Sequence, residues 1–340
     1  MRAVELVGVR QFRNAEMEIA PPRPGEVQVT VSAVGICGSD LHAYAEGGVG
    51  DMTCEYPMVL GHEPAGVVSA LGPGTSGWSI GDRAALEPAH YCYHCALCLK
   101  GRHNLCENLR FLSTVGQPGF FRERVNLPAE NLVALPSSLS LSAGTLVEPL
   151  AVALHALDLG KPRVGETAVV FGCGPIGLLT IAALRRAGIK RLWALEPVAH
   201  RGELAKKMGA DVVLPPEAFA DILPDTGKRG VDLVFDCAAK EETANQAMRL
   251  SALGGRVVLT GISSGSRLSL DVHLWRRKEL GLHQVRRSNH DGPAARDLLA
   301  AEPAFYAPLL THERPLEALP QAFSIAETYA DGVGKMVVRI

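Results

Sequence analysis

The sequence lacks the features of proteins that bind nucleic acid or insert into a membrane. Its 340 residues carry 34 Lys and Arg against 36 Asp and Glu, so the net charge of −2 gives no sign of a basic surface. The first residues, MRAVELVGVRQF, hold charges every few positions, and no later run approaches the roughly 18 apolar residues of a membrane span. Internal repeats and low-complexity linkers are also missing. We expect a cytoplasmic protein of two domains that binds neither nucleic acid nor membranes.

Cysteine is scarce outside one short stretch, YCYHCALCLKGRHNLC, which spans residues 91–106 and holds half of the eight cysteines. In a reducing compartment such a cluster favours a metal over disulfides. The spacing Cys-x2-Cys-x2-Cys-x7-Cys offers four thiolates, enough to close a tetrahedral zinc site. Four sulfur ligands leave no position for water or substrate. The sequence therefore predicts a structural zinc ion at Cys92, Cys95, Cys98 and Cys106, with four unbound thiols as the alternative.

A second, mixed set of metal-binding residue types is spread along the chain. Cys37 lies in VGICGSDLHAY, His62 and Glu63 are adjacent in PMVLGHEPAGVV, and Glu148 stands in the apolar run GTLVEPLAVALHAL. Sulfur, nitrogen and oxygen ligands together are typical of catalytic zinc, which keeps one coordination position free. Two of these residues also have a simpler interpretation: Cys37 as a small buried side chain, and Glu148 as a charge at a helix N-terminus.

The strongest local pattern lies at residues 167–197, TAVVFGCGPIGLLTIAALRRAGIKRLWALEP. An apolar strand is followed by the glycine turn of Gly172, Gly174, Pro175, Ile176 and Gly177, then by a helix and a second strand. This GxGxxG order predicts a dinucleotide site, because it allows close approach to a pyrophosphate at a helix N-terminus.

An acidic residue at the end of the second strand bears on the choice of cofactor. Glu196 follows 19 residues after Gly177, where an acid would accept the ribose hydroxyls of NAD and repel the 2′-phosphate of NADP. Arg201, five residues later, could instead accept a phosphate or stack on adenine. We favour NAD.

Strands and helices continue to alternate beyond this site. Residues 230–239 and 254–262 read as short apolar strands, and residues 241–254 between them as a helix. This alternation predicts a doubly wound parallel sheet over residues 151–285. Residues 1–150 contain short strand-like pieces with Pro and Gly turns, which is typical of a β-rich, barrel-like domain. The last residues, GKMVVRI, read as a strand that could return to that domain.

Taken together, GICGSD, PMVLGHEPAG, the cysteine stretch, GTLVEPL, GCGPIG and LEP follow an order that resembles the zinc-containing medium-chain alcohol dehydrogenase family, and within it most closely the sorbitol (polyol) dehydrogenases. The resemblance covers nearly the whole chain. It implies an α/β protein with a GroES-like catalytic domain at residues 1–150 and 286–340, which includes a structural zinc lobe at 90–108. The Rossmann coenzyme domain would span 151–285.

The resemblance also implies a role for each residue of the mixed set. Cys37, His62 and Glu63 would bind the catalytic zinc, which Glu148 would approach directly or through water. The remaining roles would fall to Asp40, which orients His62, and to Ser39 and His42, which pass the alcohol proton outward.

The substrate side departs from the polyol pattern. In VRRSNH, Arg286 matches an arginine that helps to hold the sugar chain, while Arg287 stands where a tyrosine is expected. Arg287 would then contact an acidic or phosphorylated substrate, or it is an ordinary surface charge.

The family implies a zinc-dependent oxidoreductase that transfers a hydride from a polyol or related secondary alcohol to NAD. It also implies two zinc ions per chain and a homo-dimer or homo-tetramer. L-threonine, 2,3-butanediol and a sugar-alcohol phosphate are alternative substrates. A non-catalytic nucleotide-binding protein on the same scaffold is the alternative of another class.

Overall fold

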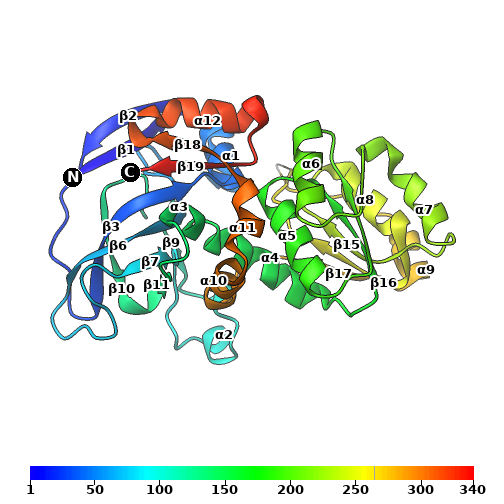
Figure 1. The fold of residues 1–340 in the computed structure, drawn as a ribbon, viewed down its shortest axis with the longest axis horizontal. Coiled ribbons are helices and arrows are strands. Elements are labelled where there is room, and N and C mark those ends of the chain that lie inside the picture. The colour runs from blue at the N-terminus through cyan, green and yellow to red at the C-terminus, as the bar shows by residue number, and fades with distance from the viewer. Residues whose placement is uncertain (264) are drawn as a thin grey trace. The chain divides into compact units, whose positions relative to one another are not determined.

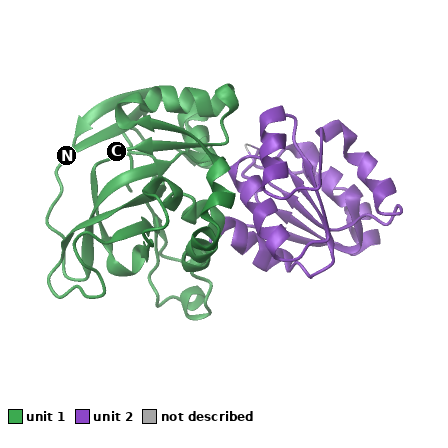
Figure 2. Cartoon of the chain, in the orientation of Figure 1, with its two compact units in different colours: residues 1–151, 289–340 green, residues 152–288 purple. Residues whose placement is uncertain are grey.

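The chain folds into two compact units (Figure 2). The structure, a computed structural model, describes residues 1–263 and 265–340. Unit 1 comprises Met1–Ala151 with Asn289–Ile340, and unit 2 comprises Val152–Ser288. The sequence places the boundaries at 150/151 and 285/286, whereas the units divide at 151/152 and 288/289. Within the described residues, none of the helices combines the length and the apolar character that crossing a membrane requires.

A seven-stranded sheet is the framework of unit 1. Its strands are β3 (Glu26–Gly35), β6 (Glu63–Leu71), β7 (Arg83–Leu86), β10 (Arg124–Pro128), β11 (Leu132–Ala134), β18 (Leu310–Pro315) and β19 (Lys335–Arg339). They run in the order β11-β7-β6-β3-β19-β18, with β10 also paired to β3. The C-terminal strand β19 pairs antiparallel with β3, which confirms that the end of the chain returns to the first domain. Val27, Val29 and Val31 of β3 are buried on one face of the sheet, while Thr30 between two of them is exposed.

Smaller elements complete unit 1 (Figure 1). Three two-stranded sheets are formed by β1 (Arg2–Gly8) with β2 (Gln11–Glu16), β4 (Gly48–Val49) with β5 (Met52–Thr53), and β8 (Ala89–His90) with β9 (Arg110–Phe111). The helices are α1 (Gly38–Glu46), α2 (Ala96–Leu99), α3 (Leu141–Gly144), α10 (Gly292–Ala301), α11 (Pro303–Tyr306) and α12 (Leu319–Thr328). Helix α4 (Val147–Gly160) begins in unit 1 and ends in unit 2.

Unit 2 is a doubly wound parallel sheet, as predicted. Its strands are β12 (Thr167–Phe171), β13 (Arg191–Leu195), β14 (Val212–Leu214), β15 (Val231–Asp236), β16 (Ser251–Leu259) and β17 (Gly281–Gln284). The order β14-β13-β12-β15-β16-β17, with every pair parallel, is the 3-2-1-4-5-6 order of dinucleotide-binding domains. The helices are α5 (Pro175–Arg186), α6 (Ala199–Lys207), α7 (Ile222–Asp225), α8 (Glu241–Leu250) and α9 (Val272–Lys278).

The helix predicted over residues 241–254 is too long by four residues. Helix α8 ends at Leu250, and β16 begins at Ser251. The register between β15 and β16 shifts after Val231, and Gly254 within this segment has a φ of +70°. The helix ends because Ser251 already has an extended conformation (φ −61°, ψ 141°), and the left-handed glycine accommodates the irregular pairing further along β16. Ser251 and Ala252 were predicted to continue the helix. They form the start of β16 instead, where they are buried and Ser251 pairs with Val231 of β15.

Candidate metal centres and nucleotide site

Two adjacent strands bring three metal-binding side chains together in unit 1. β3 ends at Gly35 and β6 begins at Glu63, and these two residues pair in the antiparallel register. Cys37 therefore lies just beyond the end of β3, beside His62 at the start of β6. The ligand atoms of Cys37, His62 and Glu63 are all within 4.8 Å of one another. Residues far apart in the sequence meet here because an antiparallel pair places the end of one strand beside the start of the other.

Asp40 is buried and holds this group in place. Its Oδ2 accepts a hydrogen bond from the backbone N–H of Cys37 (3.1 Å), and its Oδ1 lies 3.2 Å from His62 Nδ1. The backbone N–H of Gly61 also donates to Oδ1 (3.1 Å). Burial acts to raise the pKa of Asp40, but His62 and these backbone donors lower it overall. Such a contact orients a metal-binding imidazole and leaves Nε2 as the nitrogen for a ligand.

The donor set of Cys37, His62 and Glu63 fits a zinc ion of the catalytic type. A thiolate, an imidazole and a carboxylate are ligands that zinc takes, at bond lengths of about 2.0–2.3 Å. His62 is 6% and Glu63 1% exposed, so a metal would replace solvation that both side chains lack. Three protein ligands leave the fourth tetrahedral position for a substrate oxygen. These residues could therefore hold zinc with one open position.

Helix α1 carries two polar side chains that could move a proton. Ser39 Oγ is 3.3 Å from His62 Nε2, on the side of the ring that faces a ligand. His42 Nδ1 lies 2.9 Å from Glu46 Oε1, one turn further along the helix. The His42 side chain is 33% exposed. The helix thus leads from the buried group toward solvent.

Glu148 lies in the first turn of α4 and is half-buried. Among the described residues, the ligand atoms of Cys37, His62 and Glu63 lie within 4.8 Å of one another, and Glu148 does not belong to this group. Burial raises the pKa of the Glu148 carboxyl to about 8, while His62 acts to lower it and Glu63 to raise it further. These interactions place Glu148 near the group. Its contact with zinc, direct or through water, stays a prediction.

The four cysteines of residues 91–106 form a second candidate metal centre. Their sulfur atoms all lie within 4.8 Å of one another, and Cys92 Sγ is 4.0 Å from Cys98 Sγ. Backbone N–H groups point at the sulfurs: that of Cys92 donates to Cys106 (3.3 Å) and that of Cys95 to Cys92 (3.4 Å). Hydrogen bonds from the backbone, first of all that of His94, lower the pKa of Cys92 to about 5. Four converging sulfurs with donors aimed at them fit a closed zinc site.

The glycine turn of unit 2 has the geometry that a pyrophosphate needs. Gly172 follows β12 with a φ of +82°. A Cβ on Gly177 would lie 1.9 Å from the carbonyl oxygen of Gly172, so helix α5 packs against the turn only because this residue is glycine. A Cβ on Gly174 would meet no atom closer than Arg201 Nη1, at 4.0 Å. The open side of Gly174 is where a phosphate can approach the backbone, next to the N-terminus of α5, which Pro175 and Ile176 begin.

Glu196 follows β13 and faces this turn. Its Oε2 accepts a hydrogen bond from the backbone N–H of Cys173 (2.6 Å), and its Oε1 accepts one from Val198 (2.9 Å). A carboxylate has about four acceptor sites, so others stay available for ribose hydroxyls. Arg201, on α6, lies beside Gly174. The structure thus brings the predicted acid, the arginine and the glycine turn to the carboxyl ends of β12 and β13.

The predicted substrate residues Arg286 and Arg287 follow the end of β17 after one intervening residue and belong to unit 2. The sequence assigned both to the catalytic domain. Arg286 is exposed, and Arg287 is half-buried with a φ of +56°. Their contact with substrate stays a prediction.

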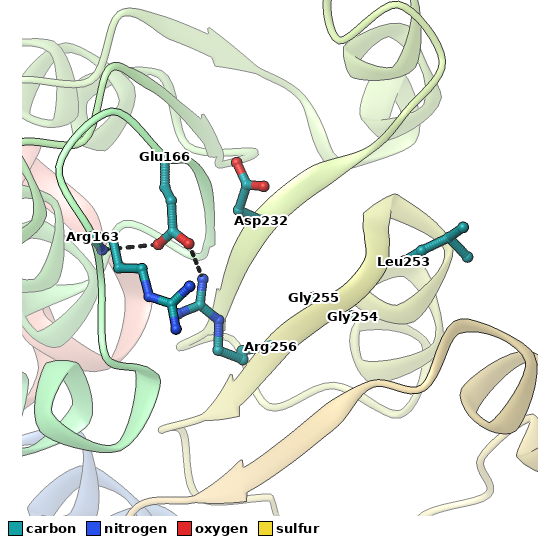
Figure 3. A pocket seen from close by; sticks show the side chains of 7 residues that line it. All are labelled: Arg163, Glu166, Asp232, Leu253, Gly254, Gly255 and Arg256. Atoms are coloured by element: carbon teal, nitrogen blue, oxygen red, sulfur yellow. Dashed lines mark hydrogen bonds and ion pairs between the residues drawn. The ribbon is translucent and has the colours of Figure 1, made fainter.

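A charged hollow in unit 2 lies at the other edge of the parallel sheet (Figure 3). Its charged lining residues are Arg163, Glu166, Asp232 and Arg256. Arg256 Nη2 is 2.5 Å from Glu166 Oε1, and Asp232 accepts a hydrogen bond from the backbone of Thr167 (2.9 Å). Ligands of open α/β sheets bind at the carboxyl ends of the strands. This hollow lies at the opposite, amino ends, because Thr167 is the first residue of β12. This hollow is therefore a paired charge cluster away from the nucleotide turn.

Sequence reasoning missed three residues that contact either the mixed group or Asp40 beside it. The Gly61 N–H and the Ser113 hydroxyl (3.3 Å) both donate to Asp40, and the amino group of Lys335 lies against Glu63. A lone lysine at the start of the apolar run KMVV was a signal for the last of these, because lysine is rarely buried without a partner.

Comparisons with known proteins decide the family. A model described as "Alcohol dehydrogenase GroES-like domain" matches residues 23–137, and one described as "Zinc-binding dehydrogenase" matches residues 175–301. The sorbitol dehydrogenase of Bacillus subtilis (strain 168) is 32% identical over 341 residues, which cover 99% of this chain and 97% of that protein. The chain belongs to the zinc-containing medium-chain alcohol dehydrogenase family.

Solved structures of other dehydrogenases resemble this member of the family over its whole length. The 2R,3R-butanediol dehydrogenase of Bacillus subtilis is 30% identical with a TM-score of 0.89, covering 100% of this chain and 99% of that one. An alcohol dehydrogenase from Escherichia coli CFT073, in complex with NADH, is 28% identical with a TM-score of 0.90 and the same coverage. The predictions of an oxidoreductase, of a GroES-like domain with a Rossmann domain, and of zinc with a nicotinamide cofactor are confirmed for the family to which the chain belongs.

Proposed function

We propose that the protein is an NAD-linked, zinc-dependent dehydrogenase of polyols or related secondary alcohols. The observation that carries this proposal is the buried convergence of Cys37, His62 and Glu63, which offers zinc three ligands and keeps one position open. Unit 1 is then the catalytic domain and unit 2 the coenzyme domain. A scaffold without turnover has no need of an open metal position beside a proton-carrying helix.

The residues of unit 1 divide the work at the reacting alcohol. Cys37, His62 and Glu63 hold the zinc ion, and Asp40 orients His62. Zinc bound there supplies Lewis-acid chemistry, which favours loss of the alcohol proton. Ser39, whose Oγ is 3.3 Å from His62 Nε2, would accept that proton while giving up its own hydroxyl proton in the direction of His42. His42, with Glu46 as its partner, would take up the relayed proton and release it to solvent.

Replacing His42 by alanine should lower kcat mainly below neutral pH. Without a side-chain base the proton must leave to water or hydroxide, and hydroxide is scarcest in acid. The measurement is the pH profile of kcat, with zinc content as the control that the buried group is intact. Kinetics unchanged across the profile would remove His42 from the proton path.

Residues of unit 2 are proposed to hold the cofactor. The turn of Gly172, Gly174 and Gly177 receives the pyrophosphate at the N-terminus of α5, and Glu196 receives the ribose hydroxyls. NAD supplies hydride acceptance, and the protein supplies its orientation. Arg201, beside Gly174, completes the phosphate side or stacks on adenine.

Replacing Glu196 by glutamine should shift selectivity from NAD toward NADP. Hydrogen bonds to charged groups contribute about 1.5–3 kcal/mol, so kcat/KM for NAD should fall roughly ten- to a hundredfold. The value for NADP should fall less or rise, because the repulsion of its 2′-phosphate is removed. Glutamine keeps one acceptor oxygen, so it can still accept from the Cys173 N–H but no longer also from the Val198 N–H. An unchanged NAD to NADP ratio contradicts the assignment of Glu196.

The substrate is tested by NADH formation with purified protein, zinc and NAD. The panel is D-sorbitol, xylitol, 2,3-butanediol, L-threonine and a sugar-alcohol phosphate. Turnover confined to the polyols supports the proposal and makes Arg287 a tolerated variation. Activity confined to the phosphate or to threonine moves the substrate and keeps the chemistry. If zinc-replete protein turns over none of them but still binds NADH, the non-catalytic nucleotide-binding alternative is favoured.

We further propose a cytoplasmic homo-dimer or homo-tetramer. None of the eight cysteines, all of them among the described residues, forms a disulfide, which suits a reducing compartment. β17 is an end strand of the six-stranded sheet, and an end strand can pair with that of a second copy. Light scattering gives the assembly, and fractionation of the source cells gives the compartment.

A further inference from the structure

Lys335 is a buried cation at the start of β19. Its side chain and that of Glu63 are both 1% exposed, and its Nζ forms an ion pair with Glu63 Oε2. The same amino group donates to the backbone carbonyl of Ile36 (2.9 Å). Lysine is rarely buried, and a buried charge without a partner is strongly destabilising. Lys335 and Glu63 therefore depend on each other for their burial.

A glycine makes this ion pair possible. β6, β3 and β19 are neighbours in the sheet, and Gly35 of the central strand pairs with Glu63 on one side and with Val337 on the other. A Cβ on Gly35 would lie 2.1 Å from Glu63 Oε2 and 2.8 Å from Lys335 Cε. The side chains of Glu63 on β6 and Lys335 on β19 therefore meet across β3, in the space that a side chain at Gly35 would fill. The pair thus occupies a space that the sheet leaves for it.

Glu63 is also one of the three residues whose ligand atoms converge. A carboxylate has two oxygens and can serve two cations at once. We propose that Lys335 is a positioning residue that holds Glu63 in the metal group and shares its negative charge with the zinc ion. The inference rests on the proposed function, because it takes Cys37, His62 and Glu63 as zinc ligands.

This sharing has two opposite consequences for the site. Without metal, Lys335 balances the charge of Glu63, so the carboxylate keeps its place. With metal, the ammonium is a like charge close to zinc, and repulsion between cations is large in a buried site. The native site is therefore preformed but binds zinc less tightly than its ligands alone would allow.

The test replaces Lys335 by methionine, which keeps an unbranched side chain and removes the charge. Zinc affinity is measured by competition with a chromophoric chelator, and the site is identified as the one that His62→Ala lacks. We expect the dissociation constant of this site to fall on the order of tenfold or more, since a like charge is removed. The metal-free variant should unfold at a lower temperature than the native protein, and zinc should raise its unfolding temperature by more than it raises the native one.

Arg256→Met is the matched control, because it breaks the Arg256–Glu166 ion pair of unit 2 (Figure 3) and leaves unit 1 untouched. It should leave zinc affinity unchanged. In a Glu63→Gln background, Lys335→Met should tighten zinc binding by a smaller factor, because the repulsion between the ammonium and zinc is still relieved but no carboxylate charge is released to the metal. Lys335→Gln, which can still donate to the Ile36 carbonyl, carries the same expectation if the methionine variant does not fold.

The outcomes separate the inference from the proposed function. Native protein with a zinc site that His62→Ala lacks, tightened by loss of Lys335, supports both. The same site left unchanged or weakened by loss of Lys335 overturns the charge sharing and leaves the dehydrogenase proposal standing. Native protein that shows no such site overturns both.

Discussion

Replacement of His62 by alanine should lower kcat/KM about a thousandfold, because a Lewis-acid metal contributes several kcal/mol of transition-state stabilisation and each 1.4 kcal/mol is tenfold. The loss follows from the way the group is built. Two ligands remain after the substitution, and the cavity left by the imidazole separates Asp40 from the group that it organises. Zinc content should fall from two ions per chain to one, since the four-cysteine centre does not depend on His62.

The measurements are steady-state kinetics with the best substrate of the panel and zinc per chain by atomic emission. His312→Ala is the matched control, because His312 on β18 contacts Asp331 and belongs to neither candidate metal group. It should retain native kinetics and both zinc ions. If His62→Ala keeps both its zinc and its activity, the catalytic centre lies elsewhere and the proposed function is wrong.

The sequence predicts best what depends on neighbours along the chain. The glycine turn and the four cysteines are local patterns, and each forms a compact structure within a few residues of its own segment. The acid after the second strand could be placed because parallel strands of one βαβ unit end at the same edge. Helix α8 shows the limit of such reasoning, since its end was set by the sheet beside it and not by its own residues.

The mixed group could not be assembled from spacing alone. Cys37 and His62 meet through the register of β3 and β6; their residue types made them candidates, and the resemblance to a family assigned them to one zinc ion. The Lys335–Glu63 pair was missed altogether, because it needs the register of three strands, the last of them from the end of the chain. The lysine that begins KMVV indicates only a buried cation, and the glycine between two charges of opposite sign appears only once the three strands are side by side. Arg286 and Arg287 show a further limit. Their motif could be recognised along the chain, but the sequence put them in the catalytic domain, whereas the structure places them in unit 2.

Replacement of Cys98 by serine should have the largest effect on stability. Structural zinc contributes folding free energy directly, about 10–16 kcal/mol in isolated zinc-binding peptides. Within a folded domain that supports the lobe from outside, we expect a loss of about 3–5 kcal/mol in the free energy of unfolding, comparable to the loss of a buried cross-link. For a chain of this size that corresponds to a fall of roughly 10 °C in Tm. One zinc ion per chain should be lost, namely that of the four-cysteine centre, which His62→Ala is expected to keep.

Cys54→Ser is the matched control, because Cys54 is a half-buried thiol that belongs to neither candidate metal group. It should keep both zinc ions and most of the native Tm. The Cys98 variant that remains folded should keep a kcat close to native, because its centre has no open position and takes no part in the reaction. A large loss of kcat with an unchanged Tm would contradict the division of labour between the two centres. Loss of both zinc ions in Cys98→Ser would show that the two centres fold as one, since independent sites should lose their metals independently.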